Sequence, residues 1–237
     1  MKPEAKSLTN HNGLNLKSKA QYFFDFSSTE DLRKITNFAN KENKNIQIIG
    51  SGTNAIFPEY FSDIVVKSTN NDFSLSDKGD EVILRVGAAV VWDDLVDFCV
   101  NKGLFGLGNL AGIPGTVGAA PVQNIGAYGE EISNFIDHVE CFDVSTNKEL
   151  KLSNSECKFG YRKSIFQESG NLIITSVSLY LSKKFEPKLH YKDLKDHAFK
   201  IKSEEELVNL VRNVRNKKIP DPNDFPNLGS FFKNPTI

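Results

Sequence analysis

A glycine-rich run from Asn109 to Glu131 constrains this chain more than any other feature. It reads N-L-A-G-I-P-G-T-V-G-A-A-P-V-Q-N-I-G-A-Y-G-E-E, with five glycines, two prolines and no charged side chain before its end. Glycine loses backbone entropy on ordering and proline lacks a donor, so the run cannot be one continuous helix or strand. An apolar, buried and irregular segment must still pair its backbone N–H groups. A large ligand rich in acceptor oxygens would pair them, and the pyrophosphate of a dinucleotide is the natural candidate.

The composition limits the class of protein. The chain has 237 residues, enough for one large or two smaller domains, and 39% hydrophobic with 25% charged residues is typical of a soluble protein. A net charge of -1 gives no field for attracting nucleic acid or an anionic membrane. No membrane span and no secretion signal are recognisable, so we expect a cytoplasmic protein. Cys99, Cys141 and Cys157 lack metal-binding spacing and are expected to be buried thiols, with no metal site.

The hydrophobic pattern predicts an α+β chain. Alternating or clustered apolar residues predict strands at 21–26, 46–49, 63–67, 82–86, 136–144 and 172–181. Helical spacing predicts a helix at 92–101 and two more that begin at capping boxes, Ser27 with Glu30 and Ser203 with Glu206. The polar stretch at 68–80 reads as a loop between a small N-terminal unit and a larger one.

A second glycine loop, Gly50–Ala55, follows a predicted strand and fits the dinucleotide fingerprint G-x-G-x-x-G/A, which is a weak signal alone. That fingerprint needs a helix directly after the loop, and Pro58 prevents one. No acidic residue stands at the end of a second strand about 20 residues on, so a Rossmann fold is rejected. A turn without a ligand remains the alternative, but two glycine loops in one chain can clamp a single ligand.

Four blocks of sequence resemble the UDP-N-acetylenolpyruvoylglucosamine reductases, flavoenzymes that complete UDP-N-acetylmuramic acid for bacterial peptidoglycan. They are G-S-G-T-N at 50–54, the run G-L-G-N-L-A-G through I-G-A-Y-G at 106–129, C-K-F-G-Y-R-K-S-I-F at 157–166, and K-I-P-D-P through G-S-F-F-K-N-P at 218–235. The resemblance implies an FAD-binding fold of the vanillyl-alcohol-oxidase type. Its two subdomains would be residues 1–70 and 71–218, and residues 219–237 would begin a third, substrate-binding domain.

The same resemblance implies non-covalent FAD, held by both glycine loops. The residues expected at the cofactor are Gly50, Ser51, Gly52, Thr53, Asn54, Ala55, Gly112, Ile113, Pro114, Gly115, Gly118, Ala119, Asn124, Gly126 and Arg215. Gln123 could add a side-chain contact. The alternatives are that the Asn side chains only cap turns and that Arg215 shares a solvated helix face with Arg212.

The family's catalytic residues match Arg162 and Ser230. Arg162 would stabilise the enolate-like carboxylate of an enolpyruvyl ether as hydride arrives, a task that suits a permanently charged, bidentate side chain. Ser230 would protonate the substrate carbon next to the carboxylate. Without the resemblance, Arg162 would be a surface ion-pair partner and Ser230 a turn residue after Gly229.

Three further positions match the family's substrate-binding residues. Tyr191 would pack on the uridine, Lys218 would meet the diphosphate and Asn234 would hydrogen-bond the nucleotide, with NADPH as the co-substrate. Lys217 and Lys218 could instead be a solvated pair before a turn. The substrate would be a UDP-sugar.

The chain departs from the family in two places. Residues 10–14 replace a family Asn-Thr-Phe-like motif. Family members also continue for on the order of a hundred residues past the Asn-Pro at 234–235, a stretch that includes a catalytic glutamate. Three interpretations stay open: an NADPH-dependent reductase, a non-catalytic FAD-binding fragment, and another oxidoreductase of the same flavin fold. The sequence does not predict an oligomeric state.

Overall fold

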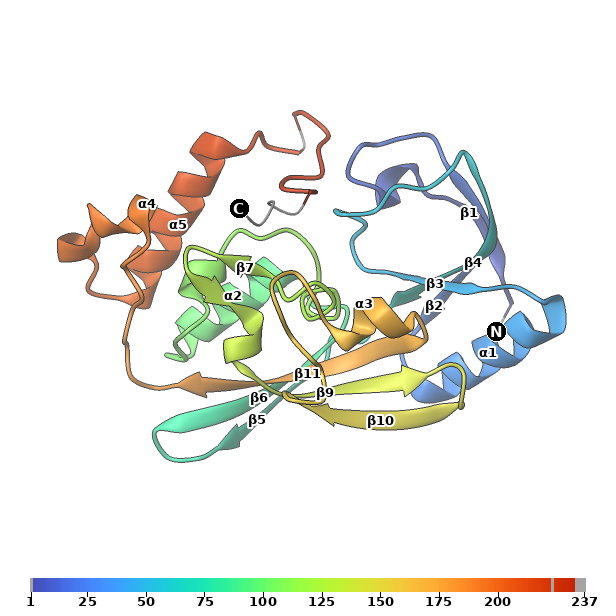
Figure 1. Ribbon diagram of the computed structural model, residues 1–237, viewed down its shortest axis with the longest axis horizontal. Coiled ribbons are helices and arrows are strands. Elements are labelled where there is room, and N and C mark those ends of the chain that lie inside the picture. The colour runs from blue at the N-terminus through green and yellow to red at the C-terminus, as the bar shows by residue number, and fades with distance from the viewer. Residues whose placement is uncertain (1, 223, 233–237) are drawn as a thin grey trace.

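The computed structural model describes residues 2–222 and 224–232, which form two β-sheets with helices around them (Figure 1). The first sheet has the strand order β1-β2-β4-β3, with β1 (Glu4–Ser7), β2 (Lys19–Phe26), β4 (Tyr60–Ser68) and β3 (Ile46–Ile49). β2, β4 and β3 are parallel, and β1 is antiparallel to β2. Parallel neighbours need a crossover, and α1 (Thr29–Glu42) supplies it between β2 and β3.

α1 begins one residue later than the sequence pattern predicts. The capping box is Ser28 with Asp31: the Ser28 hydroxyl accepts from the Asp31 N–H at 3.2 Å, and the Asp31 carboxylate accepts from the Ser28 N–H at 3.2 Å. The predicted pair of Ser27 and Glu30 was therefore wrong. Two adjacent serines followed by two adjacent acids allow either register. The extended backbone of Ser28 (φ -136°, ψ 163°) makes it the N-cap.

The second sheet is antiparallel throughout, with the order β10-β9-β11-β6-β5. Its strands are β5 (Phe73–Asp77), β6 (Glu81–Gly87), β9 (Ile136–Asp143), β10 (Lys148–Ser153) and β11 (Leu172–Ser182). Part of the predicted loop at 68–80 is thus a strand. All five residues of β5 are exposed at the sheet edge. Its sequence, F-S-L-S-D, alternates over only two apolar residues inside a polar stretch, and the strand was therefore missed.

The largest hydrophobic cluster lies between the second sheet, α2 (Trp92–Asn101), α5 (Glu204–Lys218) and the glycine-rich run. Trp92 is 1% exposed and its indole N–H donates to the Leu110 carbonyl at 2.9 Å. This bond fixes the entrance of the glycine-rich run to the core. Replacing such a side chain by Ala typically costs about 3–5 kcal/mol.

A smaller hydrophobic cluster joins the two sheets. Leu32 and Ile35 of α1 pack with Phe24 of β2, and the same cluster contains Phe142 of β9 and Ile173 of β11. The N-terminal sheet and its helix are therefore anchored on the end of the second sheet. Because buried apolar contacts span the connection, the two glycine loops are held in a fixed relation.

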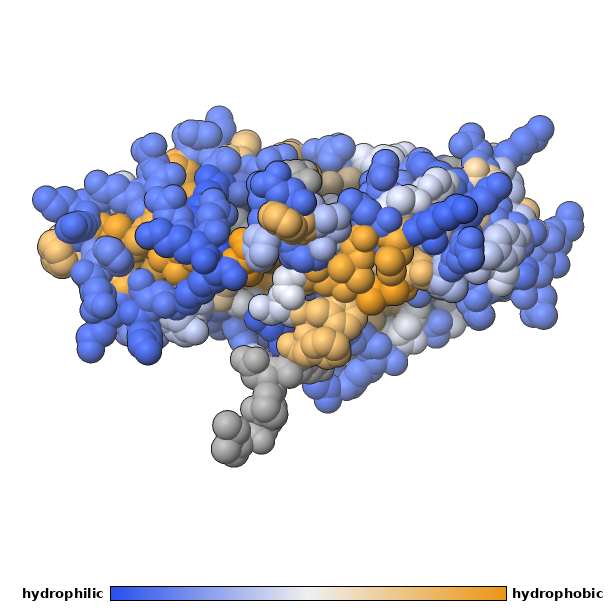
Figure 2. All heavy atoms as spheres, turned by 90° about the horizontal axis from the view of Figure 1, so that it is seen from above, coloured by the Kyte–Doolittle hydropathy of each residue, from blue (hydrophilic) through white to orange (hydrophobic). Residues whose placement is uncertain are grey.

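The remaining elements are short. They are η1 (Thr9–His11), η2 (Gly108–Leu110), β7 (Gly126–Ala127), β8 (Glu130–Glu131), η3 (Ile132–Asn134), α3 (Ile165–Ser169), α4 (Lys192–Lys195) and η4 (Ala198–Lys200). In Figure 1, α4 and α5 stand at the left over one end of the second sheet, and the C-terminal segment runs from α5 toward the first sheet. Figure 2 shows the molecule from above the view of Figure 1, and hydrophobic residues gather in the middle of that surface.

The three cysteines are buried and unpaired, and burial raises the pKa of each thiol to about 12. Such thiols stay protonated and unreactive near neutral pH. In the described part of the chain, no cluster of three or more His, Cys, Asp or Glu side chains could hold a metal ion. Across residues 2–222 and 224–232, no helix is both long and apolar enough to span a bilayer.

Candidate functional site

The first glycine loop, residues 50–55 (loop 1), follows β3 as an irregular turn with no helix after it. Gly52 has φ +77°, and a Cβ built there would lie 1.8 Å from the His11 carbonyl oxygen, so only glycine fits. The backbone N–H groups of residues 51–54 donate to no acceptor among the described residues. Four consecutive unpaired amides in one loop form a donor set for an anionic ligand.

The second loop, residues 111–129 (loop 2), is tied to the core by long-range backbone bonds. The Gly115 carbonyl accepts from Trp92 N–H at 3.0 Å, Val117 N–H donates to Val90 at 2.9 Å, and Gly118 N–H donates to Ala88 at 3.0 Å. The amides of Ile113, Gly115, Thr116, Gln123, Tyr128 and Gly129 are left without an acceptor in the described chain. Loop 2 therefore combines a fixed backbone with free donors.

The two loops lie side by side. The Asn54 side-chain amide donates to the Gln123 side chain at 3.3 Å. A Cβ built on Gly50 would lie 2.7 Å from the Thr116 hydroxyl, and one built on Gly115 would lie 3.6 Å from the Thr53 hydroxyl. Free amides on two adjacent loops match the acceptor oxygens of a pyrophosphate, so this donor set fits a dinucleotide cofactor such as FAD.

The glycines of loop 2 are needed for different reasons. Gly115 has φ +128° and no atom within 3.4 Å of an added Cβ, so the backbone conformation alone requires glycine there. Gly118 has an ordinary φ, but an added Cβ would lie 2.6 Å from the Cβ of Ala88. Gly118 thus lets loop 2 pack against the residue that follows β6. The predicted contact of Gly118 with the cofactor stays a prediction.

α5 carries two arginines to loop 2, and neither lies on a solvated face. Arg215 Nε donates to the Gly112 carbonyl at 3.1 Å, and burial lowers the pKa of its guanidinium without removing the charge at neutral pH. Arg212 pairs with Asp93 at 3.0 Å and Asp97 at 2.8 Å, while Asp93 also accepts from the Gly112 N–H at 2.6 Å. Asp93 was not predicted, because its role depends on α2 and α5 meeting loop 2.

Arg162 lies in a tight turn, in which Gly160 and Lys163 exchange backbone hydrogen bonds of 3.1 and 3.0 Å. Its φ is +52°, a conformation that L-residues adopt at a cost and that clusters at functional sites. The guanidinium donates to the Asn124 carbonyl at 3.2 Å and the Gly126 carbonyl at 2.6 Å. The structure therefore brings Arg162 against loop 2, although 36 or more residues separate them in sequence.

Tyr191 and Lys218 lie on the same side of loop 2. The exposed Tyr191 ring packs edge-on against Tyr128, with centroids 5.6 Å apart. Lys218 Nζ lies 2.6 Å from the Asp193 carboxylate, which raises the pKa of the lysine. Tyr128 and Asp193 were not predicted. Tyr128 lies within the glycine-rich run, so its place in that run was the only signal available.

The structure does not bring Ser230 into the same network. Ser230 is exposed, follows Gly229 at φ +57°, and forms no hydrogen bond with Arg162 among the described residues. The segment does approach the N-terminal turn, since a Cβ on Gly13 would lie 2.6 Å from the Asn227 carbonyl oxygen. Asn234 lies outside the described residues.

Residues 10–14, where the family motif is replaced, lie beside loop 1. Gly13 N–H donates to the Gly52 carbonyl at 3.1 Å. The buried Asn12 side chain donates to the Leu8 carbonyl at 2.9 Å and accepts from Leu16 N–H at 2.9 Å. This segment supports loop 1, and its one buried Asn serves the local turn.

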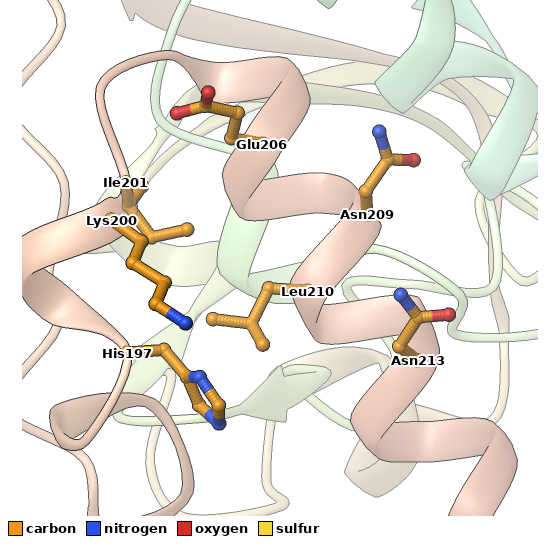
Figure 3. A pocket seen from close by; sticks show the side chains of 7 residues that line it. All are labelled: His197, Lys200, Ile201, Glu206, Asn209, Leu210 and Asn213. Atoms are coloured by element: carbon orange, nitrogen blue, oxygen red, sulfur yellow. The ribbon is translucent and has the colours of Figure 1, made fainter.

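Two surface hollows lie away from the loops. One, of about 340 Å³, lies between η4 and α5 and is lined by His197, Lys200, Ile201, Glu206, Asn209, Leu210 and Asn213 (Figure 3). The other, of about 450 Å³, lies between the two sheets beside Arg85 and Glu140. Neither includes a residue of loop 1 or loop 2, so the free amides mark the candidate cofactor site and the hollows do not.

Comparisons with known proteins identify a matching family and similar relatives. Residues 20–152 match the family described as "FAD binding domain". The chain is 37% identical over 238 residues to the UDP-N-acetylenolpyruvoylglucosamine reductase of Neisseria meningitidis serogroup A, covering 97% of this chain and 69% of the relative. It is 42% identical over 192 residues to the enzyme of the same name from Shewanella sp. (strain MR-7), covering 80% of this chain and 56% of the relative.

Solved structures give the same fold. The crystal structure of UDP-N-acetylenolpyruvylglucosamine reductase from Thermus caldophilus matches with a TM-score of 0.74 and 25% identity, covering 99% of this chain and 76% of that one. A solvent-stable cholesterol oxidase matches with a TM-score of 0.56 and 15% identity over 76% of this chain, which shows the fold alone. The predicted α+β, FAD-binding fold is therefore confirmed. The chain spans 56% of the length of one curated relative and 69% of another.

Proposed function

Because the chain belongs to the UDP-N-acetylenolpyruvoylglucosamine reductase family, we propose that it binds FAD without a covalent bond and serves the reduction of UDP-N-acetylenolpyruvoylglucosamine to UDP-N-acetylmuramate, with NADPH as donor. One observation carries the cofactor part of this proposal: loop 1 and loop 2 lie together at Asn54 and Gln123, and both present unpaired amides. The cytoplasmic location stays a prediction.

In this proposal, different groups of the chain bind the cofactor and act on the substrate. The free amides of both loops bind the pyrophosphate, and Arg215 holds loop 2 in place through Gly112. Bound FAD would supply the hydride chemistry between NADPH and the enolpyruvyl group. Arg162 would stabilise the carboxylate as negative charge grows on it. The Ser230 hydroxyl would give a proton to the carbon next to that carboxylate.

Tyr191 and Lys218 would bind the uridine and diphosphate of the substrate. Their neighbourhood supports this assignment, because an exposed aromatic face and a lysine ammonium lie on the same side of loop 2. Aromatic faces suit nucleobases and ammonium groups suit phosphates. The same two residues argue against the alternative that the chain is an oxidoreductase of this flavin fold with a different substrate. Asn234 completes the proposed set from outside the described residues.

A second candidate function is FAD binding without turnover. The observation in its favour is that Ser230 is exposed and forms no hydrogen bond with Arg162 among the described residues. The exposed aromatic side chains Phe225, Phe231 and Phe232 also lie in the segment that holds Ser230. With Ser230 apart from Arg162, the protein would hold the cofactor but leave the substrate carbon without a placed proton donor.

One purified sample tests both candidates. The protein is mixed with FAD, freed of excess cofactor and precipitated with acid, and flavin should appear in the supernatant because no covalent bond holds it. NADPH oxidation is then followed with UDP-N-acetylenolpyruvoylglucosamine and, as the matched control, UDP-N-acetylglucosamine, which lacks the enolpyruvyl group. Oxidation that depends on the first compound supports the reductase. Flavin binding without such oxidation supports the second candidate, and no flavin binding by folded protein contradicts both.

A further inference from the structure

Asn124 is expected to contact the cofactor, but its side chain is already occupied by the protein. The residue is fully buried and has φ +43°. Its amide nitrogen donates to the Glu131 carboxylate at 2.8 Å and to the Gly160 carbonyl at 3.1 Å, and its oxygen accepts from the Ser133 N–H at 3.1 Å. Both N–H bonds of the amide are used, so the side chain has no donor left for a cofactor.

These partners surround Arg162. Asn124 offers its backbone carbonyl to the guanidinium, and Gly160 belongs to the turn that carries the arginine. Glu131 pairs across the β7–β8 ladder with Gly126, whose carbonyl is the second acceptor of the guanidinium. Asn124 therefore contacts the turn, loop 2 and the nearby carboxylate at the same time.

The guanidinium and the Glu131 carboxylate are neighbours that do not pair. A Cβ built on Gly126 would lie 3.1 Å from Glu131 Cγ and 3.2 Å from Arg162 Nη1. Among the described residues, however, Arg162 forms no ion pair, and both of its acceptors are neutral carbonyls. Two of its five N–H bonds are used, so three remain for an anion.

We infer that Asn124 is a positioning residue: it holds Glu131 on its side-chain amide and so keeps the Arg162 guanidinium free of an internal carboxylate. The inference rests on the proposed function only where it says which anion benefits, namely the carboxylate of the enolpyruvyl group. If the restraint were lost, Glu131 would turn to the guanidinium, because opposite charges at this range attract strongly where water is partly excluded. The internal ion pair would then compete with the substrate.

The test is a double-mutant cycle with Asn124→Gly and Glu131→Gln. Glycine tolerates the positive φ of position 124 and removes the amide, and glutamine removes the charge that could pair with Arg162. FAD-loaded protein is titrated with UDP-N-acetylenolpyruvoylglucosamine, and binding is followed through the flavin absorbance. UDP-N-acetylglucosamine, which lacks the carboxylate, is the matched probe.

We expect Asn124→Gly to weaken binding of the carboxylate-bearing nucleotide by about tenfold or more, with little change for UDP-N-acetylglucosamine. Adding Glu131→Gln to Asn124→Gly should restore most of the lost affinity. A loss that Glu131→Gln does not restore would assign Asn124 a purely structural role and overturn the inference. Unchanged affinity in Asn124→Gly would also overturn it.

A crystal structure of Asn124→Gly without substrate separates this inference from the proposed function. We expect a Glu131 carboxylate oxygen within 4 Å of the Arg162 guanidinium, and a separation beyond that distance would overturn the inference whatever the substrate is. If wild-type protein binds neither nucleotide, the substrate assignment fails and the crystal structure still decides the role of Asn124. Should Asn124→Gly not fold, Asn124→Asp is measured in the same cycle, because aspartate tolerates the positive φ and keeps the acceptor for the Ser133 N–H but has no donor for Glu131.

Discussion

Loop 2 and the segment of residues 224–232 carry the two halves of the proposed site, and they are held in different ways. Loop 2 forms backbone hydrogen bonds to residues far away in sequence, such as Gly115 to Trp92 and Gly118 to Ala88. The described bonds of the segment are local, such as Gly229 to Asn227 and Asn227 to Pro220. Elements with few buried contacts open easily. The cofactor half is therefore preformed, while Ser230 lies on a segment that can adapt.

The largest expected effect is on turnover, from a change in the segment of residues 224–232. Ser230→Ala should slow reoxidation of the reduced flavin by substrate, because a general acid is commonly worth about 10²- to 10⁴-fold. Flavin reduction by NADPH should be spared, since the hydroxyl acts only when the substrate carbon is protonated. Rapid mixing of FAD-loaded protein measures the two half-reactions separately.

The control for Ser230 is Ser74→Ala, which removes another exposed hydroxyl, on the edge strand β5. A reoxidation rate for Ser230→Ala equal to that of the control would leave Ser230 a turn residue after Gly229. In that case, of these two regions, only loop 2 would contribute to the proposed function.

The next prediction compares two glycines of loop 2. It tests whether each is required for cofactor binding or for packing of the loop against the core. Gly115→Val should weaken FAD binding by about 100-fold or more with modest loss of stability, because a branched residue at φ +128° distorts the backbone among the free amides. Gly118→Val should lower both FAD affinity and stability, by about 1–3 kcal/mol for the latter, since its side chain would enter the space of Ala88.

FAD titration and thermal unfolding of both variants provide the measurement. Wild-type affinity in Gly115→Val would remove this glycine from the site. Equal stability losses in the two variants would show that packing, and not ligand approach, fixes both positions.

A smaller effect is expected at Arg215. Arg215→Lys keeps the charge but loses the Nε donor that holds the Gly112 carbonyl, so FAD affinity should fall by about tenfold, the value of one good hydrogen bond. Arg33→Lys is the control, because Arg33 pairs with Glu149 on the surface. If both variants bind FAD equally well, Arg215 does not support loop 2 and the preformed character of this loop has another origin.

The smallest expected effect concerns Glu204, which is buried at the start of α5. Its carboxylate accepts from the Gly108 N–H at 2.8 Å and the Gly106 N–H at 3.2 Å, just before loop 2, and burial raises its pKa. A raised pKa in the folded state means that the folded protein binds more protons than the unfolded one. The stability from this group is thus full below the unfolded pKa and is lost as pH rises through the folded pKa.

Glu204→Gln should remove that part of the pH dependence, because an amide keeps an acceptor for the two backbone N–H groups and does not titrate. The free energy of unfolding, measured from pH 4 upward, should fall less steeply with pH than in wild type. Glu205→Gln, on the exposed side of α5, is the matched control. A slope equal to that of wild type would mean that the carboxylate does not titrate differently on folding.

Local patterns in the sequence predicted most of the elements that support the site. Helix 92–101 has the predicted bounds, because its apolar stripe of Trp92, Leu95, Val96 and Cys99 repeats at helical spacing. The strands at 136–144 and 172–181 were placed to within a residue or so. β1, β5 and β10 were missed. β1 (E-A-K-S) has no apolar alternation, whereas β5 (F-S-L-S-D) and β10 (K-E-L-K-L-S) do alternate but hold only two large apolar residues each.

The sequence by itself determined that two glycine loops must interrupt the regular structure, since φ values such as +77° at Gly52 and +128° at Gly115 need glycine wherever the chain folds. Only the tertiary structure decided which side chains meet. Asn124 uses its amide on Glu131 and Gly160, Gly118 packs on Ala88, and Arg162 contacts loop 2. Backbone conformation is a local property of a residue. Partnership between distant residues depends on the packing of both sheets and α5 around one core, which no local pattern encodes.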